Sequence, residues 1–135
     1  MSEVVVLDAS AVLAFLQREN GQERVAAALK DRPCWVTTVN TCEVLGKLCE
    51  KGMPLDKAQL ALDHLKLVVV DFNAELARLA AGLRVRTKTI GASLGDRACL
   101  ALAQRAAEIE DAAVVYTTEQ AWGRLDWPFR VVAIR

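Results

Sequence analysis

A short apolar run near the amino terminus constrains the fold of this chain most strongly. Val4–Leu7 reads Val-Val-Val-Leu and is followed at once by a carboxylate, Asp8. An unbroken, mostly β-branched run is typical of a parallel strand that is buried on both faces. A buried charge is costly unless something compensates it, and ligands of open α/β sheets bind at the carboxyl ends of the strands. We therefore interpret Asp8 as the first ligand of a cation site, with Ser10 as the cap of a helix that begins near Ala11.

Apolar runs and helical patterns alternate along the rest of the chain. We expect further strands at residues 34–37, 67–70, 112–116 and 129–134, of which 67–70 is again predicted to be buried. Helices are predicted over residues 11–18, 22–30, 41–51, 55–65, 74–83, 94–107 and 120–125. This alternation predicts a parallel sheet of about five strands in a three-layer α/β/α fold, with Val4–Leu7 near its middle. No repeat or linker interrupts the 135 residues, so we expect a single domain over residues 1–135.

Composition favours a globular protein whose partners are not selected by overall charge. Apolar residues make up 53% and charged residues 25%, and 17 basic residues balance 17 acidic ones. A nucleic-acid partner would therefore need a local basic patch. No apolar run reaches the ~18–20 residues of a membrane span, and the chain does not begin like a signal peptide, so we expect a cytoplasmic protein. The four cysteines lack metal-binding spacing and are interpreted as small buried side chains, and His64 as a helix-surface residue.

Four acidic residues fall where a strand gives way to a helix or where a helix begins. Asp8 and Glu119 follow the first and fourth expected strands, and Glu43 and Asp96 lie near the starts of two helices. A parallel sheet brings such positions together at its carboxyl edge. Carboxylates without histidine or cysteine suit Mg²⁺ or Mn²⁺, which activate water and neutralise developing charge in phosphodiester hydrolysis. The pattern therefore indicates a divalent-cation site for that reaction.

Three of these acids also have a purely structural interpretation. The segments Asn40–Glu43 and Ser93–Asp96 both fit the capping-box pattern, which satisfies the amides at a helix start. Glu119 would lie in the first turn of a short helix, where an acid complements the helix dipole. Taken singly, each of the three is explained as well by capping as by metal binding. Asp8 is the exception, because it ends a buried apolar run.

Three segments carry distinctive motifs. Val6–Phe15 reads VLDASAVLAF, Leu94–Ala103 reads LGDRACLALA, and Thr118–Trp122 reads TEQAW. With these motifs the chain resembles a PIN-domain ribonuclease, and more narrowly a VapC-type toxin of a toxin–antitoxin pair. The resemblance extends over essentially the whole chain. It implies an endoribonuclease that depends on Mg²⁺ or Mn²⁺, leaves 5′-phosphate and 3′-hydroxyl ends, forms a homodimer and is inhibited by a cognate antitoxin.

The resemblance also assigns roles to individual residues. Asp8, Glu43 and Asp96 match the metal-binding acids of the family. Glu119 stands where aspartate is more usual, and because it is one methylene longer, its carboxylate would reach the metal directly, through water, or not at all.

Two hydroxyls and a basic segment complete the candidate site. Ser10 and Thr118 match hydroxyls that often accompany the first and fourth acids of the family. Because clustered acids repel a phosphate backbone, cations must hold the RNA nearby, and the local candidates are Arg84, Arg86 and Lys88. A solvated loop explains those three equally well.

The two tryptophans near the carboxyl terminus also have two interpretations. Trp122 and Trp127 could each stack a base of the RNA. Large rings of this kind are more often buried in a core or an interface, and we expect that role for both.

Two other functions are weighed against the nuclease. A phosphoryl-accepting receiver domain would use Asp71, but it would need a lysine at the end of the last strand, where this chain has Ala133–Arg135. A catalytically silent PIN-like module that binds RNA or protein is consistent with Glu119. The absence of Asp8 or Asp96 would be stronger evidence for a catalytically silent module, and both residues are present. An active nuclease is therefore the preferred prediction.

Overall fold

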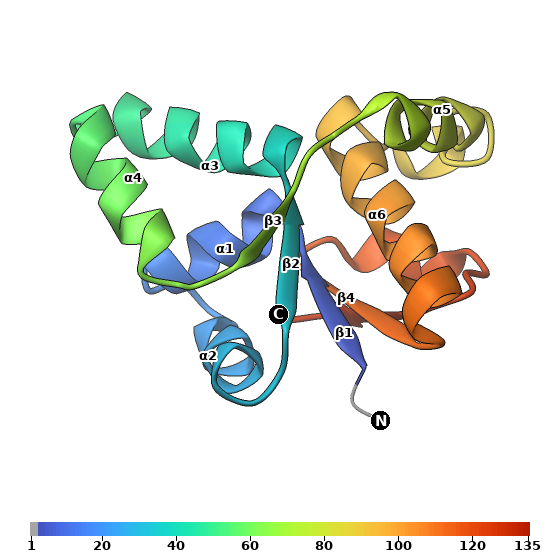
Figure 1. Ribbon diagram of the computed structural model, residues 1–135, viewed down its shortest axis with the longest axis horizontal. Helices are drawn as coiled ribbons and strands as arrows, with labels where there is room; N and C mark the ends of the chain where they lie inside the picture. Colours follow the sequence, from blue (N-terminus) through green and yellow to red (C-terminus); the bar gives the residue numbers. More distant parts are fainter. Residues whose placement is uncertain (1–2) are drawn as a thin grey trace.

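A computed structural model describes residues 3–135, in which a five-stranded sheet lies between two layers of helices (Figure 1). Every neighbouring pair of strands is parallel, and the order across the sheet is β3-β2-β1-β4-β5. The strands are β1 (Val4–Leu7), β2 (Cys34–Thr37), β3 (Val68–Val70), β4 (Ala113–Thr117) and β5 (Arg130–Ala133). The predicted three-layer α/β/α fold, with Val4–Leu7 at the centre of the sheet, is confirmed.

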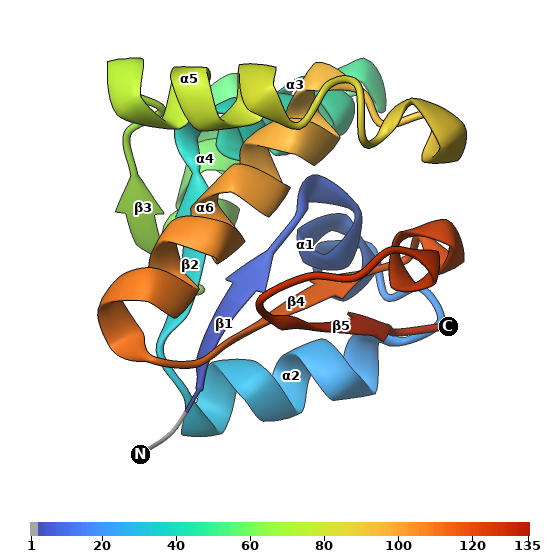
Figure 2. The same cartoon turned by 90° about the vertical axis from the view of Figure 1, so that its right-hand side faces the viewer.

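The helices divide into two groups on opposite faces of the sheet (Figures 1 and 2). One face carries α1 (Ala9–Leu16), α2 (Gln22–Asp31), α3 (Thr38–Glu50) and α4 (Leu55–Asp63). The other carries α5 (Ala74–Gly82) and α6 (Leu94–Glu110). Two short 3₁₀ helices, η1 (Lys88–Ile90) and η2 (Gln120–Arg124), precede α6 and β5.

Strand β1 supplies side chains to both hydrophobic cores. Val4 and Val6 pack in the core beneath α5 and α6, whereas Val5 and Leu7 pack in the core beneath α1 to α4. All four side chains are buried. The strand is apolar without alternation because successive side chains point to opposite faces, and a helical layer covers each face.

The prediction that residues 67–70 form another buried strand was wrong. Strand β3 lies at the edge of the sheet and pairs only with β2. Val68 and Val69 are 47% and 52% exposed. A short apolar run does not distinguish a central strand from an edge strand, because that difference depends on which strands pair.

The first helix begins earlier than predicted. Asp8, not Ser10, is the N-cap of α1, and its Oδ1 accepts a hydrogen bond of 2.8 Å from the Ala11 amide. Ser10 lies inside the first turn, where its hydroxyl donates to the same oxygen over 2.7 Å. The aspartate takes the capping position because its carboxylate follows the strand directly and faces the free amides of the helix.

The two predicted capping boxes had different outcomes. Thr37 caps α3 by accepting from the Asn40 amide, so the Asn40–Glu43 segment lies inside the helix and is not its cap. The Ser93–Asp96 box of α6 is confirmed. The Asp96 amide donates to Ser93 Oγ over 3.1 Å, and the Ser93 amide donates to Asp96 Oδ2 over 2.9 Å.

The cysteines are free and differ in exposure. Cys34 and Cys99 are buried as predicted, whereas Cys49 is half-buried and Cys42 is exposed. His64 is exposed at the end of α4, as predicted. Within residues 3–135, none of the helices combines the length and the apolar character needed to span a bilayer.

Candidate active site

Asp8 stands at the carboxyl end of the central strand and is 4% exposed. Its Oδ1 accepts from Ser10 and Ala11, and its Oδ2 accepts a 2.6 Å hydrogen bond from the hydroxyl of Thr117. A carboxylate offers about four acceptor positions, so one of them is still free for another group.

Burial makes the ionised form of Asp8 costly. It raises the pKa of Asp8 from the ordinary 3.8 to about 6, although the hydrogen bonds from Thr117, Ser10 and Ala11 act to lower it. The nearby charge of Asp96 raises the pKa slightly further. At neutral pH the carboxylate is therefore ionised in a setting that favours a positive charge beside it.

Asp96 lies in the first turn of α6 and is half-buried. The capping box occupies only one of its carboxylate oxygens, Oδ2. Capping and metal binding are therefore compatible at this residue, because a carboxylate has a second oxygen to offer.

Glu43 is held against the start of α6 by a buried amide. Asn40 is 1% exposed, and its Nδ2 donates to Glu43 Oε1 over 2.9 Å and to the Gly95 carbonyl over 3.0 Å. A Cβ on Gly95 would lie 2.5 Å from Glu43 Cδ, so the carboxylate occupies the space that any larger residue would fill. The glycine before Asp96 therefore lets α3 and α6 bring their acids together.

Glu119 follows β4 and is exposed. Its amide donates to Thr117 Oγ1 over 3.0 Å, so this buried hydroxyl connects the backbone at the fourth acid to the carboxylate of Asp8. The predicted hydroxyl, Thr118, contributes its amide instead, which donates to Ser10 Oγ over 3.0 Å. Thr117 was missed in the sequence, because only the pairing of β1 with β4 brings it beside Asp8.

All four predicted acids line one cavity of about 200 Å³ at the carboxyl edge of the sheet. The other residues that line it are Ala9, Ser10, Leu13, Asn40 and Lys47. Every acid, amide and hydroxyl in this lining offers oxygen as a ligand, and the lining contains neither histidine nor cysteine. Such donors suit hard divalent cations such as Mg²⁺ and Mn²⁺.

A buried thiol on α6 is affected by the charges of the same cluster. Cys99 on α6 is fully buried, which raises the pKa of its thiol well above the usual range. The charges of Asp8, Asp96 and Glu43 raise it further. Asp8, Asp96 and Glu43 are thus all close enough to Cys99 for their charges to act on the same thiol.

The carboxylates nevertheless do not lie as close together as the ligands of one bound metal ion. Within residues 3–135, no group of three or more histidine, cysteine, aspartate or glutamate side chains is placed to hold a metal ion. The oxygens of Asp8, Glu43 and Asp96 accept hydrogen bonds from neighbouring side chains and amides instead. The fit to a cation therefore rests on the donor chemistry and on the shared cavity.

The basic residues predicted to hold RNA lie elsewhere on the surface. Arg84, Arg86 and Lys88 are exposed, but none of them lines the cavity of the acids. The cation in the lining is Lys47 of α3, which was missed in the sequence. It follows Glu43 by four residues, a spacing that places two side chains on the same helical face.

The two tryptophans are packed within the protein. Trp122 is 1% exposed in the core, as predicted. Trp127 is half-buried, its indole nitrogen donates to the Trp122 carbonyl over 2.8 Å, and its ring stacks on Phe129 with centroids 5.3 Å apart. The Arg86 guanidinium lies 4.3 Å from the centroid of the Trp127 ring, so the basic segment is attached to this aromatic pair.

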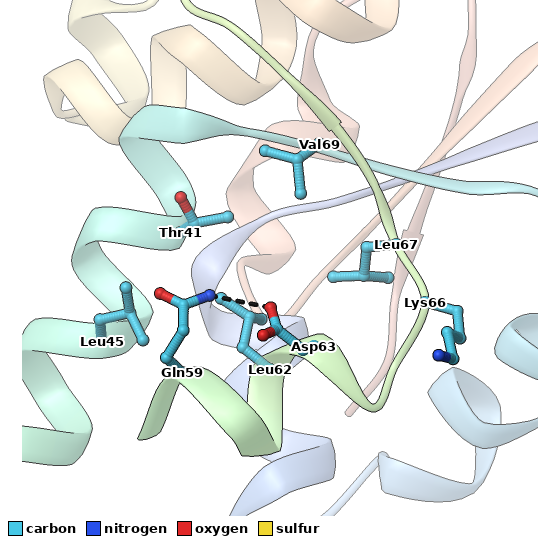
Figure 3. Close-up of a pocket in the computed structure, with 8 residues that line it drawn as sticks. All are labelled: Thr41, Leu45, Gln59, Leu62, Asp63, Lys66, Leu67 and Val69. Carbon is cyan, nitrogen blue, oxygen red and sulfur yellow. Dashed lines mark hydrogen bonds between the residues drawn. The ribbon is translucent and has the colours of Figure 1, made fainter. Parts of the chain in front are cut away.

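A second cavity, of about 300 Å³, lies between α3, α4 and the approach to β3 (Figure 3). Its walls include Leu45, Leu62, Leu67 and Val69. Its one carboxylate, Asp63, accepts a 2.9 Å hydrogen bond from Gln59, which also lines the cavity. Half of its lining is apolar and it contains a single carboxylate, so it does not share the chemistry of the four-acid cavity.

The acceptor of a receiver domain would also lie apart from the acids. Asp71 is exposed after the edge strand β3 and does not line the cavity that contains Asp8. The acidic pocket of this sheet is thus built at β1 and β4, not at β3.

Comparison of the sequence with protein families gives one match. The family model of the PIN domain matches residues 5–128, which include all four predicted acids. No curated protein matches the chain in sequence.

Solved structures of the same fold include several toxin–antitoxin complexes. DNA-bound VapBC from Salmonella typhimurium is 16% identical, with a TM-score of 0.70 over 97% of this chain and 98% of that chain. A toxin–antitoxin complex from Klebsiella pneumoniae is 14% identical, with a TM-score of 0.71 over the same shares. VapBC-5 from Mycobacterium tuberculosis is 21% identical, with a TM-score of 0.58 over 97% and 98% of the two chains. At these identities the likeness shows a shared fold.

Proposed function

This chain belongs to the PIN-domain family, and we propose that it is a metal-dependent endoribonuclease that acts as the toxin of a toxin–antitoxin pair. The observation that supports this proposal is the meeting of four carboxylates, from four separate segments, in one cavity at the carboxyl edge of the sheet. Mg²⁺ or Mn²⁺, when bound there, would supply activation of water and neutralisation of charge during hydrolysis of an RNA phosphodiester.

The proposed ligands are the carboxylates of Asp8, Glu43 and Asp96. Each is attached to a different element, and each is oriented by a hydrogen bond that leaves acceptor capacity on the carboxylate. Glu119 reaches the cavity from the turn after β4 and would bind the cation directly or through water.

Neighbouring polar groups would hold the ligands in place. Ser10 and Thr117 fix the carboxylate of Asp8 from two sides, and Asn40 fixes Glu43. Thr118 contributes through its amide to Ser10. Outer groups of this kind orient the side chains that bind a metal.

An antitoxin and a second copy of the chain are the proposed protein partners. The toxin–antitoxin complexes with the same fold support the antitoxin, and exposed apolar side chains on α4 and β3 support an interface with another chain. Leu55 and Leu60 on α4 are each 58% exposed, and Val68 and Val69 on β3 are 47% and 52% exposed. Val69 also lines the cavity of Figure 3. The RNA substrate of such a toxin would place it in the cytoplasm.

A catalytically silent PIN-like module that binds RNA or protein is the second candidate. Two observations favour it. Glutamate replaces the usual aspartate at position 119, and the acids do not lie as close together as the ligands of one metal ion. It shares the fold and the cavity of the nuclease, so only an assay of cleavage separates the two.

The test is cleavage of total cellular RNA by the purified protein in Mg²⁺ or Mn²⁺, with the new 5′ ends mapped. We expect discrete cleavage that EDTA abolishes and that Asp96→Asn reduces at least about tenfold, because losing a charged metal ligand should cost at least as much as losing a group that only orients one. The amide oxygen introduced at position 96 preserves the capping bond to Ser93, so the variant should fold. Asp126→Asn is the matched control, because Asp126 is an exposed acid outside the cavity.

Each outcome separates the candidates. Cleavage that survives in Asp96→Asn would mean a wrong site or a contaminating nuclease. A wild-type protein that binds Mn²⁺ and RNA but cleaves nothing would support the silent module.

A further inference from the structure

The four-acid cavity poses an electrostatic difficulty for a substrate that is itself an anion. Every phosphate of RNA carries a negative charge, and the cavity presents the carboxylates of Asp8, Glu43, Asp96 and Glu119. One or two divalent cations would offset charge at the reacting phosphate. The neighbouring phosphates still have to lie beside the acids, so a protein cation is needed near the rim.

Lys47 is the one lysine or arginine among the described residues that line this cavity. It lies on α3 one turn beyond Glu43, which places its Cα about 6 Å further along the helix. The acids and Lys47 therefore line the same space, while the Lys47 ammonium extends toward Glu50 further along α3.

The ammonium of Lys47 is also available. Its Nζ lies 3.8 Å from a carboxylate oxygen of Glu50, and the two side chains are 63% and 72% exposed. An ion pair this exposed contributes little to stability, so the ammonium can leave Glu50 and pair with a phosphate at little cost in free energy. A lysine acts on phosphate as a point charge on a flexible stem, and this suits a backbone whose position varies with sequence.

We propose that Lys47 is a substrate-binding residue that holds a phosphate of the RNA adjacent to the one that is cleaved. The inference rests on the proposed nuclease function and identifies where its substrate is held. It places the first backbone contact on α3, and not on the basic segment that contains Arg84, Arg86 and Lys88. Because Lys47 binds beside the reaction centre and is not a metal ligand, its loss weakens affinity for RNA and does not weaken affinity for the cation.

The experiment compares Lys47→Gln with Lys51→Gln, which removes the same charge one helical turn further on. Lys51 is exposed and does not line the cavity. Binding of a short labelled single-stranded RNA is followed by fluorescence anisotropy, with Ca²⁺ in place of Mg²⁺, over a series of salt concentrations. KM and kcat for RNA cleavage are then measured in Mg²⁺, and Mn²⁺ binding by calorimetry.

We expect Lys47→Gln to weaken RNA binding about tenfold more than Lys51→Gln, and to reduce the slope of log K against log salt by about 0.7, the value for one phosphate contact on a single strand. KM should rise with kcat little changed, Mn²⁺ binding should be unchanged, and Lys47→Arg should restore most of the affinity.

Equal effects of Lys47→Gln and Lys51→Gln on RNA binding, in a wild-type protein that does cleave RNA, would overturn this inference alone. A loss of Mn²⁺ binding in Lys47→Gln would overturn it as well, since the lysine would then act through the acids. A wild-type protein that neither binds nor cleaves RNA would overturn the proposed function and this inference together.

Discussion

Replacing Asp8 with asparagine should stabilise the metal-free protein at neutral pH. The carboxylate is buried at the end of the central strand, and burial raises its pKa to about 6. Asparagine has nearly the same shape and carries no charge. Its carbonyl oxygen can still accept from Ser10 and the Ala11 amide, and its amide can donate to Thr117 Oγ1. The substitution therefore removes the cost of the charge and keeps most of the hydrogen bonds.

The magnitude follows from the change in pKa. The pKa of Asp8 moves from 3.8 in the unfolded chain to about 6 in the folded one, and each pH unit corresponds to about 1.4 kcal/mol, so ionisation costs about 3 kcal/mol. Between these two values the folded state binds more protons than the unfolded state, so this group makes stability fall as pH rises. Below pH 3.8 the cost is absent, and above about pH 6 it is present in full.

The measurement is the free energy of unfolding in urea, with EDTA present, for wild type and Asp8→Asn between pH 4 and pH 8. We expect the variant to be about 2–3 kcal/mol more stable at pH 7 and nearly equal to wild type at pH 4. Saturating Mn²⁺ should reduce the difference in free energy of unfolding between the variant and wild type at pH 7, because the cation stabilises only the wild type. Asp126→Asn is the control. A variant that is less stable than wild type at every pH would refute the reasoning, since it would show that the carboxylate contributes more as an acceptor than its charge costs.

Three further substitutions test other parts of the site and its surroundings. Gly95→Ala should reduce RNA cleavage at least about tenfold, because the new Cβ displaces the exposed carboxylate of Glu43. The free energy of unfolding in urea should change by less than about 1 kcal/mol, because alanine also improves the helix propensity. Thr117→Val should lower the free energy of unfolding by about 1–3 kcal/mol in the same assay, because the hydrogen bond from the Thr117 hydroxyl to Asp8 is lost. The same hydrogen bond lowers the pKa of Asp8, so the acidic limb of the pH–rate profile should move to higher pH. Leu60→Glu should change stability by less than about 0.5 kcal/mol, since the side chain is 58% exposed, and should increase the monomer fraction in sedimentation. An unchanged dimer would remove α4 from the proposed interface.

The meeting of the four acids could be anticipated from the sequence because parallel topology is a strong constraint. Once Val4–Leu7 is a central strand, residues that follow parallel strands must lie at one edge of the sheet, whatever the loops do. Asp8 and Glu119 illustrate this, because each directly follows its strand or lies two residues beyond it, and both line the cavity. No side-chain geometry is needed to reach that conclusion.

Contacts between elements could not be read in the same way. Thr117 bonds to Asp8 because β4 pairs with β1 in a particular register, and Asn40 bonds to Gly95 because α3 packs against the start of α6. A single sequence contains neither the pairing nor the packing. Lys47 was missed for a related reason: surface lysines are common, and only the folded helix shows which of them faces the acids.

Capping and metal binding, which look like competing interpretations in the sequence, are compatible in the fold. Asp8 caps α1 and Asp96 completes the capping box of α6, yet each of these hydrogen bonds uses only part of the carboxylate. A helix start is a favourable place for an acid, because the free amides and the helix dipole both stabilise its negative charge. The helix starts thereby hold carboxylates at the sheet edge before any cation binds. At Asp8 this compensation is incomplete, as its raised pKa shows, and the remaining unfavourable energy is what a bound cation would relieve.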